Sequence, residues 1–286
     1  MIKKVGIISK WGRPEPPEIL RELLPWLSSK GVEAFCDSTY QSLDEFGPTR
    51  CDIEEMPSKV DMGIVLGGDG TMLWAARLFS MREVPLLGVN LGGMGYITEV
   101  ASSNLLQTMQ NVLSGDCTTE KRIMLSVEHK REDETLAKLS ALNDVVVNKG
   151  TSARIIELEV LVDGISITRY RADGIIICTP TGSTAYSLSA GGPILYPTLN
   201  SLLLTPICPH TLTNRPIVLP GDAVVDIRLI SVSDNVILTH DGIVSSTIAS
   251  GDIISIRRSS QVTALIMPPK HDHFDALKTK LKWGER

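Results

Sequence analysis

The sequence has few cysteines, and they form no pattern that would fix a fold. Their number is odd, they are widely separated, and no two of them form a CxxC pair: Cys36, Cys51, Cys117, Cys178 and Cys208. This excludes a disulfide framework and a cysteine-based zinc site. Such usage is typical of reduced thiols in the cytosol.

Long apolar runs and an excess of one charge are also missing. No segment approaches the roughly 18 apolar residues that span a bilayer, and the run behind Lys3 and Lys4 is only Val5–Ile8, too short for a signal peptide. The net charge is -5, from 28 basic and 33 acidic residues, without a long run of either sign. We therefore expect a cytoplasmic protein that binds neither membrane nor nucleic acid.

The first 118 residues alternate short apolar runs with helical stretches. This pattern predicts an α/β domain with an open, mostly parallel, Rossmann-like sheet, over residues 1–118. The expected strands are Val5–Ser9, Val32–Cys36, Met62–Leu66 and Leu86–Val89, and the expected helices are Glu18–Lys30, Thr71–Phe79 and Leu105–Leu113.

Residues 119–268 carry many short strand-like segments instead. They predict an all-β, sandwich-like domain, with a hairpin turn at Asp163-Gly164. The expected strands are Ile123–His129, Leu136–Asn148, Ile155–Val162, Ile165–Tyr170, Gly174–Cys178, Val224–Leu229, Val236–Leu238, Ile253–Arg257 and Val262–Ile266. Residues 269–286 return to a helical pattern, Phe274–Trp283, which we expect to pack back on the first domain.

The most informative segment is the loop Gly67-Gly68-Asp69-Gly70-Thr71, which follows a buried strand and opens a helix. Glycines let phosphate oxygens approach the backbone amides, and a helix N-terminus favours negative charge. A carboxylate repels phosphate, so Asp69 makes sense there if it accepts a proton from an attacking hydroxyl or helps to place Mg²⁺.

The alternative for Asp69 is that its side chain only caps the following helix. The loop matches neither the Walker pattern nor the GxGxxG fingerprint, which excludes an ordinary P-loop enzyme or dehydrogenase.

Two further segments carry polar groups and glycines. Gly88–Tyr96 follows the next strand, so both glycine loops belong to the carboxyl edge of the sheet, where open α/β sheets bind ligands. Thr179–Pro193 gathers hydroxyls, glycines and one tyrosine. It suits a polar ligand with an aromatic surface beside it, although such loops are often structural. Ser183 is not in a GxSxG elbow, which disfavours a hydrolase.

Taken in order, these segments resemble the NAD kinase family over nearly the whole chain. The resemblance rests on the Gly-Gly-Asp-Gly-Thr loop, the Gly-Val-Asn-Leu-Gly loop at 88–92, Leu142-Asn143-Asp144, and Thr179–Tyr186. It implies transfer of a phosphoryl group from ATP, or from another triphosphate or polyphosphate, to the 2′-hydroxyl of the adenosine ribose of NAD. It also implies Mg²⁺ and a homo-oligomer, dimeric or tetrameric.

The resemblance assigns roles residue by residue. Asp69 would be the catalytic base, and the phosphate-binding loop would comprise Gly67, Gly68, Thr71 and Gly92. The NAD-binding residues would be Gly70, Tyr96, Asn143, Asp144, Arg171, Asp173, Thr184, Ala185, Tyr186 and Ser189.

Three positions depart from the family pattern. Asp144 stands in place of a glutamate and reaches one methylene less far. Tyr96 stands where phenylalanine is more frequent, and Gly93 where a bulky or basic residue often occurs. The last change puts the phosphate contacts of that loop in doubt.

Arg171 and the histidines carry further expectations. A basic residue at Arg171 favours NAD over NADH in related kinases, and the alternative is a surface arginine at a strand end. We expect His240-Asp241-Gly242 near the ligand. His271 and His273 form an HxH pair that we interpret as exposed to solvent rather than as metal ligands.

Two rival functions remain open. A lipid or sugar-phosphate kinase shares the first motif, but a lipid kinase needs an apolar groove or a basic membrane surface that the sequence does not show. A non-catalytic sensor of NAD(H) or NADP(H) would have no use for Asp69 beside phosphates.

Overall fold

The computed structural model describes residues 2–9, 18–38, 47–92, 95–98, 100–152, 154–232, 235–269 and 272–283. The chain forms two compact units, residues 1–121 with 263–286 (unit 1) and residues 122–262 (unit 2). Strands β7 (Thr118–Arg131) and β18 (Ile253–Met267) carry the chain from one unit to the other. Among the described residues, no helix combines the length and the apolar character that a membrane span requires.

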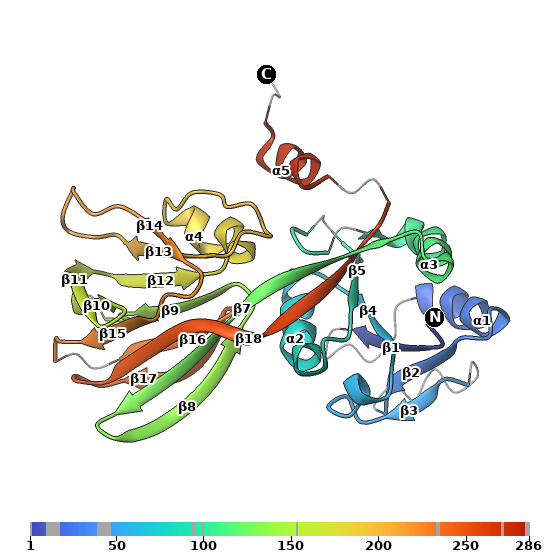
Figure 1. Cartoon of the computed structure of the whole chain (residues 1–286), viewed down its shortest axis with the longest axis horizontal. Helices are drawn as coiled ribbons and strands as arrows, with labels where there is room; N and C mark the ends of the chain where they lie inside the picture. The colour runs from blue at the N-terminus through green and yellow to red at the C-terminus, as the bar shows by residue number, and fades with distance from the viewer. Residues whose placement is uncertain are drawn as a thin grey trace. The chain divides into compact units, whose positions relative to one another are not determined.

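Unit 1 is built on a parallel sheet (Figure 1). Its strand order is β18-β5-β4-β1-β2-β3, with β6 paired to β5. The strands are β1 (Lys4–Ser9), β2 (Glu33–Asp37), β3 (Thr49–Cys51), β4 (Met62–Leu66), β5 (Leu86–Asn90) and β6 (Val100–Ala101). Strands β4 and β5 are buried along their whole length, which is why they consist of uninterrupted apolar residues and glycine.

Helices cover both faces of this sheet (Figure 1). Helices α1 (Ile19–Ser29) and α3 (Leu105–Ser114) pack on the face that carries Ile7 and Ile64. Helix α2 (Asp69–Phe79) lies on the other face, where Phe79 meets the backbone of Gly63. Helix α3 ends at Gly115, whose left-handed φ of 80° glycine adopts without strain.

The C-terminal helix α5 (His273–Leu281) belongs to unit 1. The carboxylate of Asp272 caps it by accepting a hydrogen bond from the N–H of Phe274 at 2.9 Å. Leu277 is its buried apolar contact.

Unit 2 consists of two packed sheets. One contains β11-β10-β15-β18 and the β7-β8 pair, and the other has the order β14-β13-β12-β9-β16-β17. The bounds are β8 (Glu134–Ala141), β9 (Asp144–Asn148), β10 (Ile156–Val162), β11 (Ile165–Ala172), β12 (Gly174–Cys178), β13 (Ser201–Ile207), β14 (Ile217–Pro220), β15 (Val225–Leu229), β16 (Val236–His240) and β17 (Ile243–Ile248). Helix α4 (Tyr186–Ser189) follows a 3₁₀ turn over Thr181–Thr184.

The packing explains the local sequence patterns. The two sheets share one core to which Val145 and Val147 of β9 contribute, while Val146 packs on the opposite face with Ile176 and Leu195. The central strands of the second sheet are therefore buried on both faces and have continuous apolar sequences. Strand β10 alternates apolar and polar residues because only one of its faces is buried.

The structure confirms the predicted fold class, an α/β domain with a largely parallel sheet followed by a β-sandwich. Three details were wrong. The expected strand Leu136–Asn148 is two strands in different sheets, and the two expected strands at 253–257 and 262–266 are one, β18. Strands β3, β6, β13, β14 and β17 were not predicted.

Candidate active site

Asp69 is the first residue of α2, and its carboxylate binds the segment 96–98. Oδ2 accepts the N–H of Tyr96 at 2.8 Å, and Oδ1 accepts the N–H groups of Ile97 and Thr98, each at 3.1 Å. The hydroxyl of Thr98 also donates to Oδ1 at 3.1 Å. Asp69 therefore joins the two glycine loops of unit 1.

The interpretation of Asp69 as a helix cap is wrong. The N-cap of α2 is Gly68, and no side chain caps the helix there. Of the four hydrogen bonds that the structure gives this carboxylate, only one reaches Oδ2. A carboxylate oxygen offers about two lone-pair directions, so Oδ2 can accept one further hydrogen bond.

Close backbone approach explains two of the glycines. A Cβ at Gly95 would lie well under 3.0 Å from Asp69 Oδ1 and from the hydroxyl of Thr98. A Cβ at Gly67 would likewise meet the side chain of Thr71. The amide of Asn90 donates to the carbonyl of Thr98 at 3.4 Å, so β5 also holds the second loop.

The other predicted residues of the phosphate loop lie in the two glycine loops of unit 1. Gly68 and Gly70 are exposed at the N-terminus of α2, and Thr71 is buried. Gly92 is exposed, and its N–H donates to Asn90 Oδ1 at 2.7 Å. Gly93 lies outside the described residues. Exposed glycine amides at a helix N-terminus suit phosphate oxygens.

In unit 2, residues 142–144 bend sharply between β8 and β9. The carboxylate of Asp241 accepts the N–H groups of Leu142, Asn143 and Asp144 at 3.1, 2.8 and 3.4 Å. These bonds replace sheet pairing at this point, which explains why the expected strand 136–148 breaks. Asp241, placed near a ligand on sequence grounds, thus shapes the segment that carries Asn143 and Asp144.

The loop after β12 packs on the same segment. The hydroxyl of Thr179 donates to the carbonyl of Leu142 at 2.6 Å, and its N–H donates to the carbonyl of Asn143 at 2.9 Å. Gly182 approaches the backbone of Asn143 so closely that a Cβ would clash. Within unit 2 the structure therefore brings together two of the four motifs found in the sequence, Leu142–Asp144 and the run that begins at Thr179.

Two buried oxygens at this place, Asn143 Oδ1 and Thr181 Oγ1, have no hydrogen-bond partner among the residues that the structure describes. Buried polar atoms are nearly always paired, so such atoms mark a place where a ligand or water binds. Thr181 was not among the predicted site residues. Its sequence signal was only its position inside the Ser/Thr-rich loop.

Asp144 is buried beside Asp241. Burial, and then the negative charge of Asp241, raise the pKa of Asp144 from 3.8 to about 7. The folded protein therefore holds a proton on this carboxyl that the unfolded chain releases near pH 4.

We expect Asp144→Asn to stabilise the protein above neutral pH. Between about pH 4 and 7 the native state binds more protons than the unfolded state, so stability conferred at low pH is lost as pH rises. The amide carries no charge to bury, and the variant should gain on the order of 1–3 kcal/mol at pH 8 relative to wild type. Urea unfolding at pH 4.5 and pH 8 measures this; an equal difference at both pH values contradicts it.

Asp173 lies just before β12, at the end opposite Cys178, and Arg171 lies near the end of β11. Gly174 pairs with Asn148, whereas Cys178 pairs with Asp144, which places Asp173 roughly 16 Å from Asp144 along the strand. Asp173 forms an ion pair with Lys149 at 2.8 Å, and Arg171 is exposed. Within unit 2 these two residues are therefore not gathered with Asn143 and Asp144, and Lys149 is a charged neighbour that the sequence did not single out.

The remaining predicted residues follow the 3₁₀ turn. Thr184 donates to the carbonyl of Thr181 at 3.3 Å, and Ala185 is half-buried. Tyr186 and Ser189 are exposed. Tyr186 begins α4 directly after the turn that carries Thr181, and its exposed ring offers the aromatic surface expected from the sequence.

The predicted exposure of the HxH pair is wrong for His273, which is partly buried at the start of α5; His271 lies outside the described residues. His240 is also partly buried, and its Nδ1 contacts the hydroxyl of Ser245. No cluster of three or more metal-ligating side chains occurs in the part of the chain that the structure describes.

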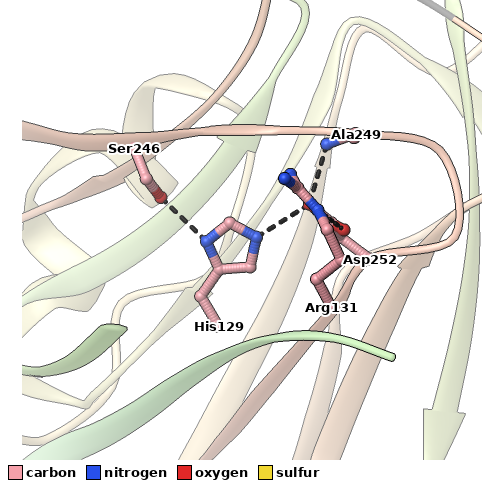
Figure 2. Close-up of polar contacts among 5 residues, drawn as sticks. All are labelled: His129, Arg131, Ser246, Ala249 and Asp252. Atoms are coloured by element: carbon pink, nitrogen blue, oxygen red, sulfur yellow. Dashed lines mark hydrogen bonds and ion pairs between the residues drawn. The ribbon is translucent and has the colours of Figure 1, made fainter. Parts of the chain in front are cut away.

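A second polar cluster lies in unit 2 around Asp252 (Figure 2). His129 Nε2 donates to Asp252 Oδ2 at 2.9 Å, and His129 Nδ1 lies 3.0 Å from the hydroxyl of Ser246. Arg131 binds both carboxylate oxygens, at 2.8 and 2.9 Å, and the N–H of Ala249 donates to Oδ2 at 2.8 Å. The Ser-His-Asp order resembles a hydrolase triad. However, His129 is 1% exposed and Arg131 neutralises Asp252, so the cluster is structural.

Replacing Asp252 by asparagine should lower the free energy of unfolding by about 2–4 kcal/mol at pH 7. Burial alone would raise the pKa of this carboxyl, but hydrogen bonds from Arg131, Ala249 and His129 lower it from 3.8 to about 2. Its contribution is thus complete above pH 4 and is lost as pH falls towards 2. Denaturant titrations at pH 7 and pH 3 should show a smaller loss at the lower pH. The exposed Asp222→Asn is the matched control, and equal stability of the two variants would contradict the prediction.

Comparison with known proteins shows which family has this fold and these motifs. Residues 5–117 match the family model described as the ATP-NAD kinase N-terminal domain, and residues 142–267 match the ATP-NAD kinase C-terminal domain. The chain belongs to the NAD kinase family.

Relatives in this family match over their whole length. The NAD kinase of Geobacter metallireducens is 47% identical over 286 residues, and that of Geobacter sulfurreducens is 45% identical over 289, each with full coverage of both chains. The crystal structure of yeast NADH kinase complexed with NADH has a TM-score of 0.92 at 28% identity, covering 100% of this chain and 89% of the yeast chain. An NAD kinase from Archaeoglobus fulgidus in complex with ATP has a TM-score of 0.76 at 24% identity, covers 98% of both chains, and shares the fold.

The two family domains of NAD kinases coincide with the two groups of site residues. The Asp69 loop and Tyr96 lie in the match to the N-terminal domain, whereas Asn143, Asp144 and the loop at 179–186 lie in the match to the C-terminal domain. The resemblance seen in the motifs therefore extends to the whole chain.

Proposed function

We propose that this member of the NAD kinase family transfers the γ-phosphoryl group of ATP to the 2′-hydroxyl of the adenosine ribose of NAD, with Asp69 as the base. The observation that best supports this proposal is the position of the Asp69 carboxylate. Four hydrogen bonds hold it at the N-terminus of α2, between two glycine loops. A carboxylate beside phosphate-binding amides serves proton transfer, whereas simple phosphate binding gains nothing from it.

The chemical step follows from this geometry. Asp69 Oδ2 accepts the proton of the ribose hydroxyl as the oxygen attacks the γ-phosphorus, and ADP leaves. The exposed amides of Gly68 and Gly70, with the partial positive charge of the helix N-terminus, stabilise the charge on the phosphoryl oxygens. Mg²⁺ bound to the triphosphate would neutralise charge on the phosphate oxygens, since this ion is commonly held through such oxygens and one or two carboxylates.

Unit 2, taken by itself, also carries groups that suit a dinucleotide. The unpaired oxygens of Asn143 and Thr181 are acceptors for ribose hydroxyls or the adenine amino group, and Tyr186 offers its ring to a base. Thr184, Ala185 and Ser189 line the same turn.

We assign Arg171 and Asp173 to NAD binding in a homo-oligomer. Because they lie away from Asn143 and Asp144 within unit 2, they would contact NAD bound by a neighbouring copy of the chain. The exposed apolar side chains of β14 and β17, Ile217, Val218, Ile243 and Val244, are available for such contacts. We place the enzyme in the cytoplasm, consistent with its five unpaired thiols.

The test is formation of NADP from NAD and Mg-ATP, read with an NADP-specific dehydrogenase, on protein whose mass in solution is measured by light scattering. Product and a mass of two or more chains are expected. If no triphosphate or polyphosphate gives product while NAD still binds, the chain is a sensor of NAD rather than a kinase. A monomer with full activity would remove the role of Arg171 and Asp173 from a second copy.

A further inference from the structure

The C-terminal helix reaches the second glycine loop through one lysine. Lys280 Nζ lies 3.6 Å from the centroid of the Tyr96 ring, and this nitrogen is buried. A cation within about 6 Å of an aromatic ring centroid is attracted to the ring face, and more strongly when solvent is excluded. A buried ammonium also requires such compensation, because burial disfavours charge.

The contact falls on a residue already held from its backbone side. The N–H of Tyr96 donates to Asp69 Oδ2, and the next two N–H groups donate to Oδ1. Burial, and then the charge of Asp69, raise the pKa of the Tyr96 phenol, so the ring is neutral at physiological pH. The ammonium of Lys280 therefore interacts with the face of a neutral ring.

Two contacts fix helix α5 and hold the side chain of Lys280 in place. Leu277, three residues before Lys280, is buried, and Asp272 caps the N-terminus of the helix. Lys278 differs from Lys280, because it is exposed and forms a surface ion pair with Asp275 at 3.0 Å. The same helix thus carries one lysine in a buried contact and one that serves as an internal control.

We propose that Lys280 is a positioning residue for NAD: it holds the Tyr96 ring, and with it the segment 95–98 against Asp69, so that α5 is a working part of the acceptor site. This inference rests on the proposed function, which places Tyr96 at NAD. The mechanism needs no contact between Lys280 and the reacting atoms. It predicts a defect in the use of NAD rather than of ATP.

The test compares Lys280→Met, Lys280→Arg and the control Lys278→Met. Methionine keeps an unbranched side chain, one atom shorter than lysine, and removes the charge, whereas arginine keeps a cation on the ring. We expect Lys280→Met to raise the KM for NAD by about tenfold with the KM for ATP unchanged. Lys280→Arg should recover most of the loss, and Lys278→Met should match wild type. In a Tyr96→Leu background, Lys280→Met should add nothing further.

Hydrogen exchange separates this inference from the proposed function. The amides of Tyr96, Ile97 and Thr98 should exchange faster in Lys280→Met than in Lys278→Met, whether or not NADP is formed. Wild-type kinetics and exchange in Lys280→Met would overturn the inference, as would an equal loss in the Tyr96→Leu background. If wild type makes no NADP, the proposed function fails, and exchange alone decides whether Lys280 holds the loop.

Discussion

Asp69→Asn should lower the rate of NADP formation by roughly 10²–10⁴-fold while NAD still binds. An amide cannot accept the proton of the ribose hydroxyl. It can still place an oxygen at Oδ1, where Ile97 and Thr98 donate. Only the bond from the N–H of Tyr96 is lost, so the free energy of unfolding should fall by about 1 kcal/mol.

The measurement is kcat with saturating NAD and Mg-ATP, together with the dissociation constant for NAD and a denaturant titration. Asp116→Asn, an exposed aspartate of unit 1, is the matched control. Near-normal turnover in Asp69→Asn would remove the base assignment. Loss of NAD binding together with turnover would instead make Asp69 an anchor of the loop at 96–98 and no more.

Gly95→Ala should have the second-largest effect, a fall in turnover of roughly 10²-fold. The new Cβ would overlap Asp69 Oδ1 and the hydroxyl of Thr98. Both atoms are ends of side chains, so the protein relieves the overlap by rotating them and keeps its fold. The base is then displaced from its fixed position. Turnover, with a melting temperature within a few degrees of wild type as a check on folding, measures this.

Both variants are expected to act through the carboxylate of Asp69, so the double variant serves as a control. If Gly95→Ala works by displacing Asp69, it should cost far less in an Asp69→Asn background than in wild type. Fully multiplicative losses would show that Gly95 matters for another reason, such as direct approach of the ligand.

Local sequence predicted most of unit 1. The strands β1, β4 and β5 and the helices α1 and α3 were expected within two residues of their bounds, because continuous burial and helical spacing of leucines are local signals. The left-handed glycine that ends α3 is equally local. The position of the Asp69 loop at a strand-to-helix turn followed from the same signals.

The partners of the site residues depend on residues far away in sequence. Asp69 binds N–H groups 27 to 29 positions later, and Asn143 is held by Asp241, 98 positions later. No periodicity around residues 136–148 reveals a bend imposed by that distant carboxylate. Strand β18 was divided in two because its middle, Arg257–Gln261, is polar and resembles a turn. Lys280 gave no signal, since a lysine in a C-terminal helix is usually solvated.

The passage of the chain through β18 also sets the order in which the protein can mature during synthesis. The first 121 residues leave the ribosome early, yet Leu86 of β5 pairs with Leu265 of β18, which is made much later. Unit 2 is made entirely in between and is the first unit whose strands are all present. The sheet that carries the Asp69 loop therefore lacks the pairing with β18 until residues near Leu265 have been synthesised. An unpaired strand edge can pair wrongly with another chain during this time. The contact between Lys280 of α5 and the Tyr96 ring forms later still, because α5 follows β18 in the chain.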